Sequence, residues 1–370
     1  MRITVIGPTY PYKGGISHFT TQLVRTLRKD HTVDFISWKR QYPAFLYPVE
    51  PKDTSSKHPV KEEAKYLLDF LNPVTWFSTV QEIKKFKPDK VLITWINPIQ
   101  APIYFTIASM IKKTTHTNVS FICHNVLPHE PSRIDKPLTK LALKTGDTFI
   151  VHSSEDKHIL ESLIQKKKIT KGFLPLFEMF ETKPITNTDR IKEELKLKKN
   201  VLLFFGYIRP YKGLTYLIKA MPSILKKVPD SSLLIVGEHW AKDEKIYSEL
   251  ISKLGLQQDI VSINTYVPNE ELYKYFSVSD VVVLPYTSAT QSAAVQTAYA
   301  FNKPVISTSV GGLKDAVIEG ETGLFIKPRS VEDITEKVIK FYTMEYKSRL
   351  RIDREKFSWD KYVNLVQAAV

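Results

Sequence analysis

The sequence has 370 residues, of which 43% are hydrophobic and 25% are charged, a composition that fits a globular protein and excludes a low-complexity chain. A length of 370 residues exceeds what one hydrophobic core usually supports, and no solenoid-like repeat is present, so two domains are expected. The single cysteine, Cys123, excludes an intrachain disulfide and fits a reducing, cytoplasmic compartment.

The net charge of +14 is concentrated in the first half of the chain. Residues 1–183 contain 27 Lys and Arg against 17 Asp and Glu, whereas the remainder contains 26 against 22. Such an excess can serve solubility, a nucleic acid or an anionic membrane surface. No zinc-finger spacing or RNA-recognition signature is present, so no nucleic-acid partner is expected. Two lysine groups could meet lipid headgroups at the inner face of a membrane: Lys84, Lys85 and Lys87, and Lys166, Lys167, Lys168 and Lys171.

The chain opens with an apolar run, Ile3–Ile6, which predicts a buried strand and is too short for the core of a signal peptide. A turn from Gly7 to Gly15 follows, and then a helix before a second strand at Thr32–Ile36. A strand, a helix and a strand in this order are typical of a parallel sheet. The apolar residues that recur at helical spacing are Ile16, Phe19, Leu23, Val24 and Leu27.

The rest of the first half continues this alternation. Residues 40–75 begin rich in Pro, Lys and Ser and predict a long, partly mobile loop. The uncharged stretch Val91–Ile111 is long enough to span a bilayer, but Asn97 and Pro98 interrupt it, so we interpret it as a strand, a loop and a helix. Further strands are expected at Lys90–Trp95, Val119–Cys123 and Thr148–Val151. Further helices are expected at Val80–Phe86, Ile103–Lys112, Leu138–Lys144 and Glu155–Ile164.

A polar, proline-containing stretch, Phe173–Thr188, predicts a linker, after which a second alternation begins. Its expected strands are Val201–Phe205, Ser232–Val236, Ile260–Asn264, Val281–Leu284 and Pro304–Thr308. Its expected helices are Leu214–Ile224, Tyr247–Leu254, Asn269–Ser277 and Ala293–Phe301. We therefore expect an α/β protein of two Rossmann-like, doubly wound domains, residues 1–178 and 185–356, with a final helix of residues 357–370 packing back on the first. Ligands bind beyond the carboxyl ends of such strands, so a two-substrate site in a central cleft is predicted.

The loop Gly206–Gly213 is the sharpest chemical signal. A strand ends at Gly206, Arg209 and Lys212 follow, and a helix begins just after Gly213. A diphosphate needs this combination, because Arg offers a planar fork of donors, Lys a compact charge, and a helix start free N–H groups. A pair of solvated loop cations is the plain alternative, and the position at a strand's carboxyl end favours a functional role.

The order and spacing of several motifs resemble those of the nucleotide-sugar glycosyltransferases of family 4, which have the two-domain fold called GT-B. The resemblance covers almost the whole chain. Its carriers are Gly14-Gly15, Phe121–Val126, the loop with Arg209 and Lys212, Val281–Tyr286, Lys303–Ser307, Gly311-Gly312 and Glu319–Phe325.

The resemblance implies roles for several residues. Arg209 and Lys212 would neutralise the donor diphosphate and the departing charge, so that no metal and no cofactor are needed. His124 would face the reacting sugar, and we group it with these two as catalytic. Gly14 and Gly15 would let the backbone approach the diphosphate from the first domain. On the acceptor side we place His129 and Glu130.

The sequence departs from the family at two positions. Relatives carry two glutamates, separated by seven residues, ahead of the Lys-Pro-Val strand; here Ala289 and Thr297 stand in their places. The first glutamate grips the donor sugar and the second the ribose, so a weaker or differently seated donor is expected. The remaining donor-binding candidates are Gly206, Glu238, Thr290, Gln291, Ser292 and Thr297.

We expect a retaining, hexosyltransferase-type enzyme that moves a sugar from a nucleotide-diphosphate donor, bound by the second domain, to a hydroxyl of a glycan or lipid-linked glycan held by the first. A role in surface polysaccharide or glycolipid assembly is predicted, with the protein cytoplasmic and peripheral to the membrane. Two alternatives stay open. One is a non-catalytic nucleotide-sugar-binding protein, and the other is a nucleotide-sugar epimerase or a phosphorylase of the same architecture.

Overall fold

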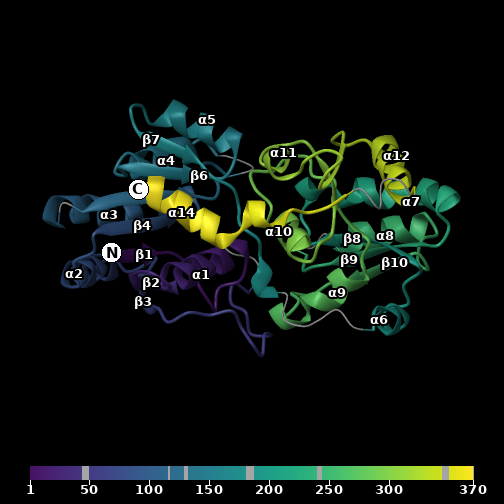
Figure 1. The fold of residues 1–370 in the computed structure, drawn as a ribbon, viewed down its shortest axis with the longest axis horizontal. Helices are drawn as coiled ribbons and strands as arrows, with labels where there is room; N and C mark the ends of the chain where they lie inside the picture. Colours follow the sequence, from purple (N-terminus) through teal and green to yellow (C-terminus); the bar gives the residue numbers. More distant parts are fainter. Residues whose placement is uncertain are drawn as a thin grey trace. The chain divides into compact units, whose positions relative to one another are not determined.

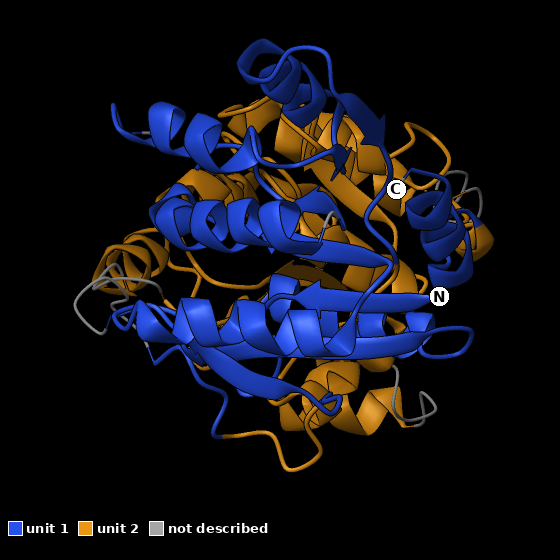
Figure 2. Ribbon diagram, turned by 90° about the vertical axis from the view of Figure 1, so that its left-hand side faces the viewer, with its two compact units in different colours: residues 1–54, 60–175, 356–370 blue, residues 55–59, 176–355 orange. Residues whose placement is uncertain are grey.

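The computed structural model describes residues 1–43, 50–115, 117–128, 132–180, 187–239, 244–343 and 350–369. The chain divides into two compact units, which are coloured separately in Figure 2. Unit 1 contains residues 1–54, 60–175 and 356–370, and unit 2 contains residues 55–59 and 176–355. The short segment 55–59 belongs to unit 2 because Ser56 Oγ accepts from the Asn269 amide at 3.2 Å. Each unit is built around one sheet of parallel strands (Figure 1).

Unit 1 has seven parallel strands in the order β3-β2-β1-β4-β5-β6-β7. The strands are β1 (Arg2–Ile6), β2 (Thr32–Arg40), β3 (Lys65–Asp69), β4 (Lys90–Trp95), β5 (Asn118–Cys123), β6 (Thr148–Val151) and β7 (Lys168–Lys171). The helices are α1 (Gly15–Leu27), α2 (Val74–Phe86), α3 (Ala101–Thr115), α4 (Asp135–Leu143), α5 (Ser154–Leu163) and α14 (Trp359–Ala369), with the 3₁₀ turn η2 (Pro98–Gln100).

Helices cover both faces of this sheet, which explains why its central strands are continuous apolar runs. Helices α2, α3, α4 and α5 share one hydrophobic core with the strands. Helix α14 comes from the end of the chain and packs against α1, β6 and β7 on the opposite face (Figure 1). Its ion pair from Asp360 to Lys29 is exposed, so its apolar face, rather than this pair, holds it in place.

Unit 2 has six parallel strands in the order β10-β9-β8-β11-β12-β13. The strands are β8 (Asn200–Phe205), β9 (Ser231–Val236), β10 (Ile260–Ile263), β11 (Val281–Leu284), β12 (Val305–Thr308) and β13 (Gly323–Ile326). The helices are α6 (Thr188–Glu194), α7 (Leu214–Lys227), α8 (Glu244–Lys253), α9 (Leu272–Val278), α10 (Ala293–Ala300), α11 (Leu313–Ala316) and α12 (Val331–Tyr342). Short 3₁₀ turns are η3 (Glu178–Phe180), η4 (Pro210–Lys212), η5 (Asn269–Glu271) and η6 (Arg354–Phe357).

The expected α/β class with two parallel sheets is confirmed, and one expectation about the first half is wrong. Residues 40–75 are not one long loop, because they contain β3, which pairs with β2 at the sheet edge, and α2 begins at Val74. Residues 44–49 of that stretch lie outside the described residues. The uncharged stretch Val91–Ile111 forms β4, η2 and part of α3, as expected. Among the described residues, no helix is long and apolar enough to cross a membrane.

Candidate functional site

The loop after β8 is shaped by two glycines with left-handed backbones. Gly206 has φ 101°, and a Cβ added to it would lie 3.1 Å from Lys212 Nζ, so the lysine folds back over the end of the strand. Gly213 has φ 71°, and its added Cβ would lie 2.0 Å from the carbonyl oxygen of Pro285. Between them, η4 gathers Arg209 and Lys212 into one short turn. The chain therefore reaches α7 only if both turn positions lack a side chain.

Both cations of this loop lie near aromatic rings. The Arg209 guanidinium carbon is 5.3 Å from the ring centre of Tyr211, and Lys212 Nζ is 5.4 Å from that of Tyr286. Burial, followed by the neighbouring Arg209 charge, lowers the pKa of Lys212 to about 7. Within the described ranges, Lys212 forms no ion pair with a carboxylate. Lys212 is thus a buried cation beside a second cation, and an anion bound next to it would compensate its charge.

The carboxyl ends of three neighbouring strands, β9, β8 and β11, meet at this loop. Gly237 follows β9, and its added Cβ would lie 2.2 Å from the carbonyl oxygen of Gly206. Glu238 comes next, and its carbonyl accepts from the Ile208 amide at 2.9 Å. From the end of β11, the Thr287 amide donates to the Tyr211 carbonyl at 2.7 Å. The predicted loop residue Glu238 therefore stands beside the turn that carries Arg209.

The loops after β11 and β12 are packed backbone to backbone. The Gly312 amide donates to the Thr290 carbonyl at 2.8 Å, and a Cβ on Gly311 would lie 1.5 Å from the Ala289 carbonyl oxygen. Gln291 also lies against Gly312. Ser292 is buried and directly precedes α10. The polar run from Thr290 to Ser292 is thus held at the same sheet edge as Arg209 and Lys212.

Thr297 lies in a different environment from these loop residues. It is 1% exposed, and its hydroxyl donates to the Ala293 carbonyl at 2.8 Å within α10. A contact with a ribose would require this hydroxyl to leave its own helix. Ala289, at the other position where relatives carry glutamate, is 7% exposed. Neither position places a carboxylate at the sheet edge.

Unit 1 holds a second cluster, which consists of His124, His152, Phe19 and Tyr362. His124 follows β5, and its ring centre is 5.0 Å from that of His152, which follows β6. The ring centre of Phe19, from α1, lies 4.4 Å from that of His124, and the two ring planes are nearly perpendicular. The Tyr362 hydroxyl, from α14, is hydrogen-bonded to His152 Nε2 at 2.8 Å. Of these residues, the sequence had indicated only His124 as functional.

Three buried histidines of unit 1, His18, His124 and His152, are neutral at physiological pH. Burial lowers the pKa of His124, and the nearby His152 lowers it further. Burial also lowers the pKa of His152 to about 3, and that of His18, four residues after Gly14, to about 4, although Asp53 opposes the latter shift. Nε2 of His124 is buried and makes no hydrogen bond within the described part of the chain. Neutral imidazoles of this kind orient a hydroxyl by hydrogen bonding rather than by charge.

The remaining predicted residues of unit 1 are only partly described. Gly14 has φ 104°, precedes α1, and has open space around the position of an added Cβ, while Gly15 is the first residue of that helix. This arrangement leaves room for a ligand at the start of α1. His129 and Glu130 lie outside the described residues. Across the described ranges, no group of three or more His, Cys, Asp or Glu side chains is arranged to hold a metal ion.

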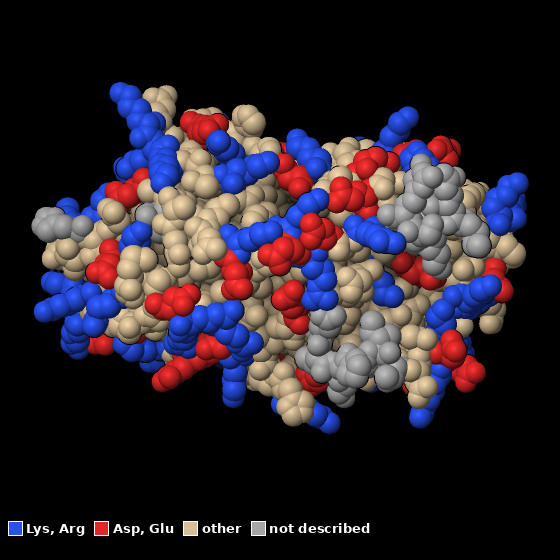
Figure 3. Space-filling view, in the orientation of Figure 1, with Lys and Arg blue, Asp and Glu red and all other residues tan. Residues whose placement is uncertain are grey.

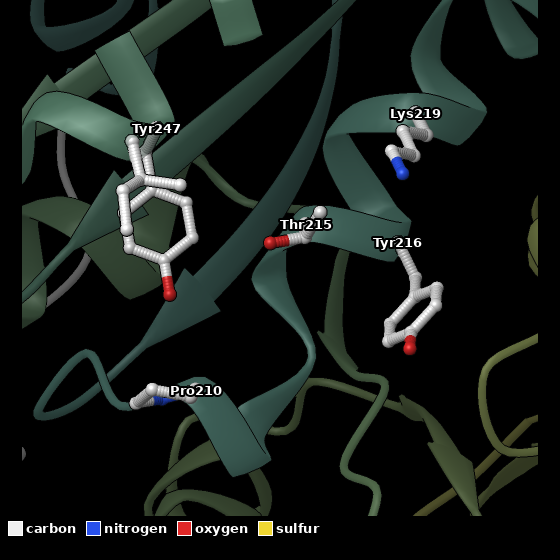
Figure 4. A pocket seen from close by; sticks show the side chains of 6 residues that line it. Pro210, Thr215, Tyr216, Lys219 and Tyr247 are labelled. Carbon is white, nitrogen blue, oxygen red and sulfur yellow. The ribbon is translucent and has the colours of Figure 1, made fainter. Parts of the chain in front are cut away.

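A small hollow of about 250 Å³ lies between α7 and α8 (Figure 4). In Figure 4, Thr215 stands between the rings of Tyr247 and Tyr216. The hollow shares Pro210 with the loop Gly206–Gly213, which we call the cation loop, but it includes neither Arg209 nor Lys212. It is also smaller than ordinary ligand pockets. The hollow is therefore a separate feature from the strand ends that carry Arg209 and Lys212. The lining residues are Pro210, Thr215, Tyr216, Lys219, Ile246 and Tyr247.

Residues 186–359 match the sequence profile of the family described as Glycosyl transferases group 1. A D-inositol 3-phosphate glycosyltransferase from Corynebacterium glutamicum is 32% identical over 151 residues, which cover 39% of this chain and 35% of the relative. An uncharacterised glycosyltransferase from Methanocaldococcus jannaschii is 29% identical over 44% of this chain and 42% of its own length. The matched segment thus spans between about a third and two fifths of these curated relatives.

Solved structures share the fold over the whole chain. Sucrose-phosphate synthase from Thermosynechococcus elongatus has a TM-score of 0.70 at 18% identity and covers 99% of both chains. Anabaena HepE, solved in complex with UDP and glucose, has a TM-score of 0.72 at 15% identity and covers 100% of both chains. At these identities the likeness shows the fold alone, and it confirms the expected GT-B architecture.

Proposed function

We propose that the chain is a glycosyltransferase whose unit 2 binds a nucleotide-diphosphate sugar, because residues 186–359 match the profile of the glycosyl transferases group 1 family. One observation carries this proposal above the others. Arg209 and Lys212 are gathered by η4 at the carboxyl ends of the strands, and Lys212 has no carboxylate partner among the described residues. A diphosphate supplies the missing negative charge.

The same cations account for catalysis without a metal or another cofactor. When the bond between the sugar and the phosphate breaks, the leaving nucleotide diphosphate gains negative charge. Arg209 and Lys212 are fixed beside that position and need no rearrangement, so they stabilise the transition state more than the ground state. An anion beside Lys212 raises its lowered pKa, so the bound donor would keep this side chain protonated.

We further propose transfer with retention at the anomeric carbon. The acceptor hydroxyl would attack from the face that the diphosphate leaves, and the leaving phosphate oxygen would take its proton. His124, which is buried and neutral, suits a role in orienting a sugar hydroxyl rather than in removing a proton. The acceptor hydroxyl is assigned to the side of unit 1, where Gly14, Gly15 and His124 follow their strands.

For the acceptor we propose a glycan or lipid-linked glycan in surface polysaccharide or glycolipid assembly. Unit 1 contains 27 Lys and Arg against 16 Asp and Glu, a net charge of +11, which supports association with an anionic membrane surface. For the donor, UDP-sugars are the first class to test, because HepE was solved with UDP-glucose.

A second candidate function is a protein that binds a nucleotide sugar without turnover. It is favoured by Ala289 and Thr297, which place no carboxylate where relatives grip the sugar and the ribose. Each lost charge-assisted contact weakens donor binding by about tenfold or more. The same absence argues against an epimerase, which needs carboxylates near the donor sugar.

The test is a thermal-shift screen with UDP, GDP, ADP, CMP and TDP sugars, using the wild type and an Arg209→Ala, Lys212→Ala variant. We expect one nucleotide class to raise the melting temperature of the wild type and not that of the variant. Donor turnover with supplied acceptors then separates the two candidates. A shift without any turnover or hydrolysis would favour the binding protein, and no shift with any donor would overturn both.

A further inference from the structure

Three strongly exposed apolar side chains lie within seven residues of unit 1. Leu71, Val74 and Phe77 are 52%, 71% and 49% exposed, and they occupy the turn before α2 and its first turns. Single exposed apolar residues are ordinary on a protein surface. A group of three on one helix end is a different feature, because it costs solvation free energy unless something covers it.

The outer face of α2 changes from apolar to basic along its length. At 3.6 residues per turn, Val74, Phe77, Gln81 and Lys85 fall on one face, opposite the buried Val80 and Ile83. Lys84 and Lys85 form the last turn, and Lys87 follows it. An apolar stretch continued by lysines is typical of a helix that lies in a membrane interface.

The charges around this face leave it positive. The one acidic residue within α2, Glu82, is paired with Lys85 at 2.6 Å and lies 4.0 Å from Lys65. Within the described ranges, Lys84 and Lys87 form no ion pair. Asp89 binds the Arg2 amide at 2.7 Å. Figure 3 shows Lys and Arg side chains over the left-hand end of the molecule, where Figure 1 places α2.

The second lysine group lies at the opposite edge of the sheet. Helix α2 follows β3, whereas Lys166–Lys171 surround β7, six strand spacings or about 29 Å away. There, Lys168 Nζ donates to the Ala368 carbonyl at 2.9 Å and Lys171 Nζ to Ser154 Oγ at 3.0 Å. No large apolar side chain of β7 or α5 is exposed among the described residues. Only the group at α2 therefore combines lysines with exposed apolar side chains that could enter a bilayer.

We propose that the exposed apolar side chains Leu71, Val74 and Phe77, together with Lys84 in the last turn of α2 and Lys87 just after it, form the surface that binds an anionic lipid bilayer. The apolar side chains would enter the headgroup region, and the lysines would pair with lipid phosphates. This inference deepens the membrane association in the proposed function by assigning it to one edge of unit 1. The group at β7 takes no part in it.

The test is co-sedimentation of the whole protein with phosphatidylglycerol-containing vesicles at low salt. We expect a Val74→Ser, Phe77→Ser variant to lower the partition coefficient at least tenfold. The matched control is Ile246→Ser, Ile318→Ser, which removes two exposed apolar residues of unit 2 and should change partition by less than twofold. A Lys84→Gln, Lys87→Gln variant should lose about tenfold, and the charge-matched Lys166→Gln, Lys167→Gln less than twofold.

Several outcomes would overturn this assignment. They are absence of vesicle binding by the wild type, equal losses in the test and control variants, or a change of oligomeric state in Val74→Ser, Phe77→Ser with vesicle binding unchanged. Circular dichroism establishes that the variants are folded. The nucleotide-induced thermal shift should be the same in every variant of this set. A protein that binds vesicles through α2 but no nucleotide would therefore refute the proposed transferase and leave the lipid surface standing.

Discussion

The Tyr362 hydroxyl lies 2.8 Å from Nε2 of His152, 210 residues earlier in the chain. This bond fastens the last helix to the carboxyl end of a central strand of unit 1. The His152 ring in turn packs against that of His124. We therefore predict that Tyr362 positions His124 through His152, without itself contacting substrate.

Tyr362→Phe should destabilise the protein by about 1–3 kcal/mol, because it leaves a buried imidazole nitrogen without its partner. Denaturant unfolding measures this loss. The matched control is Tyr104→Phe, since Tyr104 is also fully buried but its hydroxyl contact to Gln100 is 3.5 Å long. A positioning role further predicts that kcat falls several-fold while the donor KM stays within twofold. An unchanged kcat would show that Tyr362 has a structural role only.

Lys212→Met should raise the melting temperature of the ligand-free protein at pH 7. An unfolded lysine has its ordinary pKa of 10.5, whereas the folded pKa is about 7, so the unfolded state binds more protons between these values. Wild-type stability therefore rises with pH across this window, and the advantage of the variant shrinks from pH 7 to pH 9. By calorimetry at pH 7, we expect the melting temperature of the variant to lie about 1–3 °C above that of the wild type. A melting temperature of the variant below that of the wild type at pH 7 would contradict the inference that the Lys212 charge is uncompensated.

Binding of a nucleoside diphosphate should weaken as the pH rises above 7. The free protein then loses the Lys212 proton that the bound anion requires, so affinity falls by up to about tenfold per pH unit. Titration calorimetry between pH 7.5 and 9, where the nucleotide phosphates are already ionised, measures this slope. Lys212→Met should bind weakly with a flat profile. A flat profile in the wild type would place the anion elsewhere.

Gly213→Ala should cost about 2–4 kcal/mol of unfolding free energy, because the left-handed backbone is strained by a side chain and the Cβ would meet the Pro285 carbonyl at 2.0 Å. Gly255→Ala is the matched control. Gly255 has a similar φ of 68° with open space around it, so only the backbone strain of about 1 kcal/mol remains. Equal losses of unfolding free energy in the two variants would mean that the backbone at Gly213 can move away from the Pro285 carbonyl at little cost.

The sequence predicts the central strands and the edge strand β10 well, and the edge strands β3 and β7 poorly. Strands β4 and β6 begin and end where expected, because they are buried on both faces and read as continuous apolar runs. Strands β3 and β7 were missed, since each is a short edge strand with lysine at its start and little burial. Helix α12 was also missed, although Ser330 accepts from the Asp333 amide at 3.1 Å, a capping signal visible in the sequence.

The residues of the candidate site also fall into those that the local sequence predicts and those that it does not. Arg209 and Lys212 were predicted because their loop is local, lying between one strand and the next helix. The aromatic ring of Tyr286 beside Lys212, and Tyr362 beside His152, were not, because both contacts join segments far apart in the chain. The expected ribose contact of Thr297 remains a prediction, and its hydroxyl is bonded to the Ala293 carbonyl.

The position of α14 also constrains how the polypeptide matures on the ribosome. Phe19, in α1, packs against Trp359 and Tyr362, so unit 1 lacks part of its core until α14 has left the exit tunnel. All residues of unit 2 lie between 55 and 355, so this unit can complete its fold before α14 is made. Until α14 is made, a nascent chain exposes apolar surface of unit 1 to chaperones. Loss of the codons for α14 would consequently damage unit 1, although the strands of that unit are encoded far upstream.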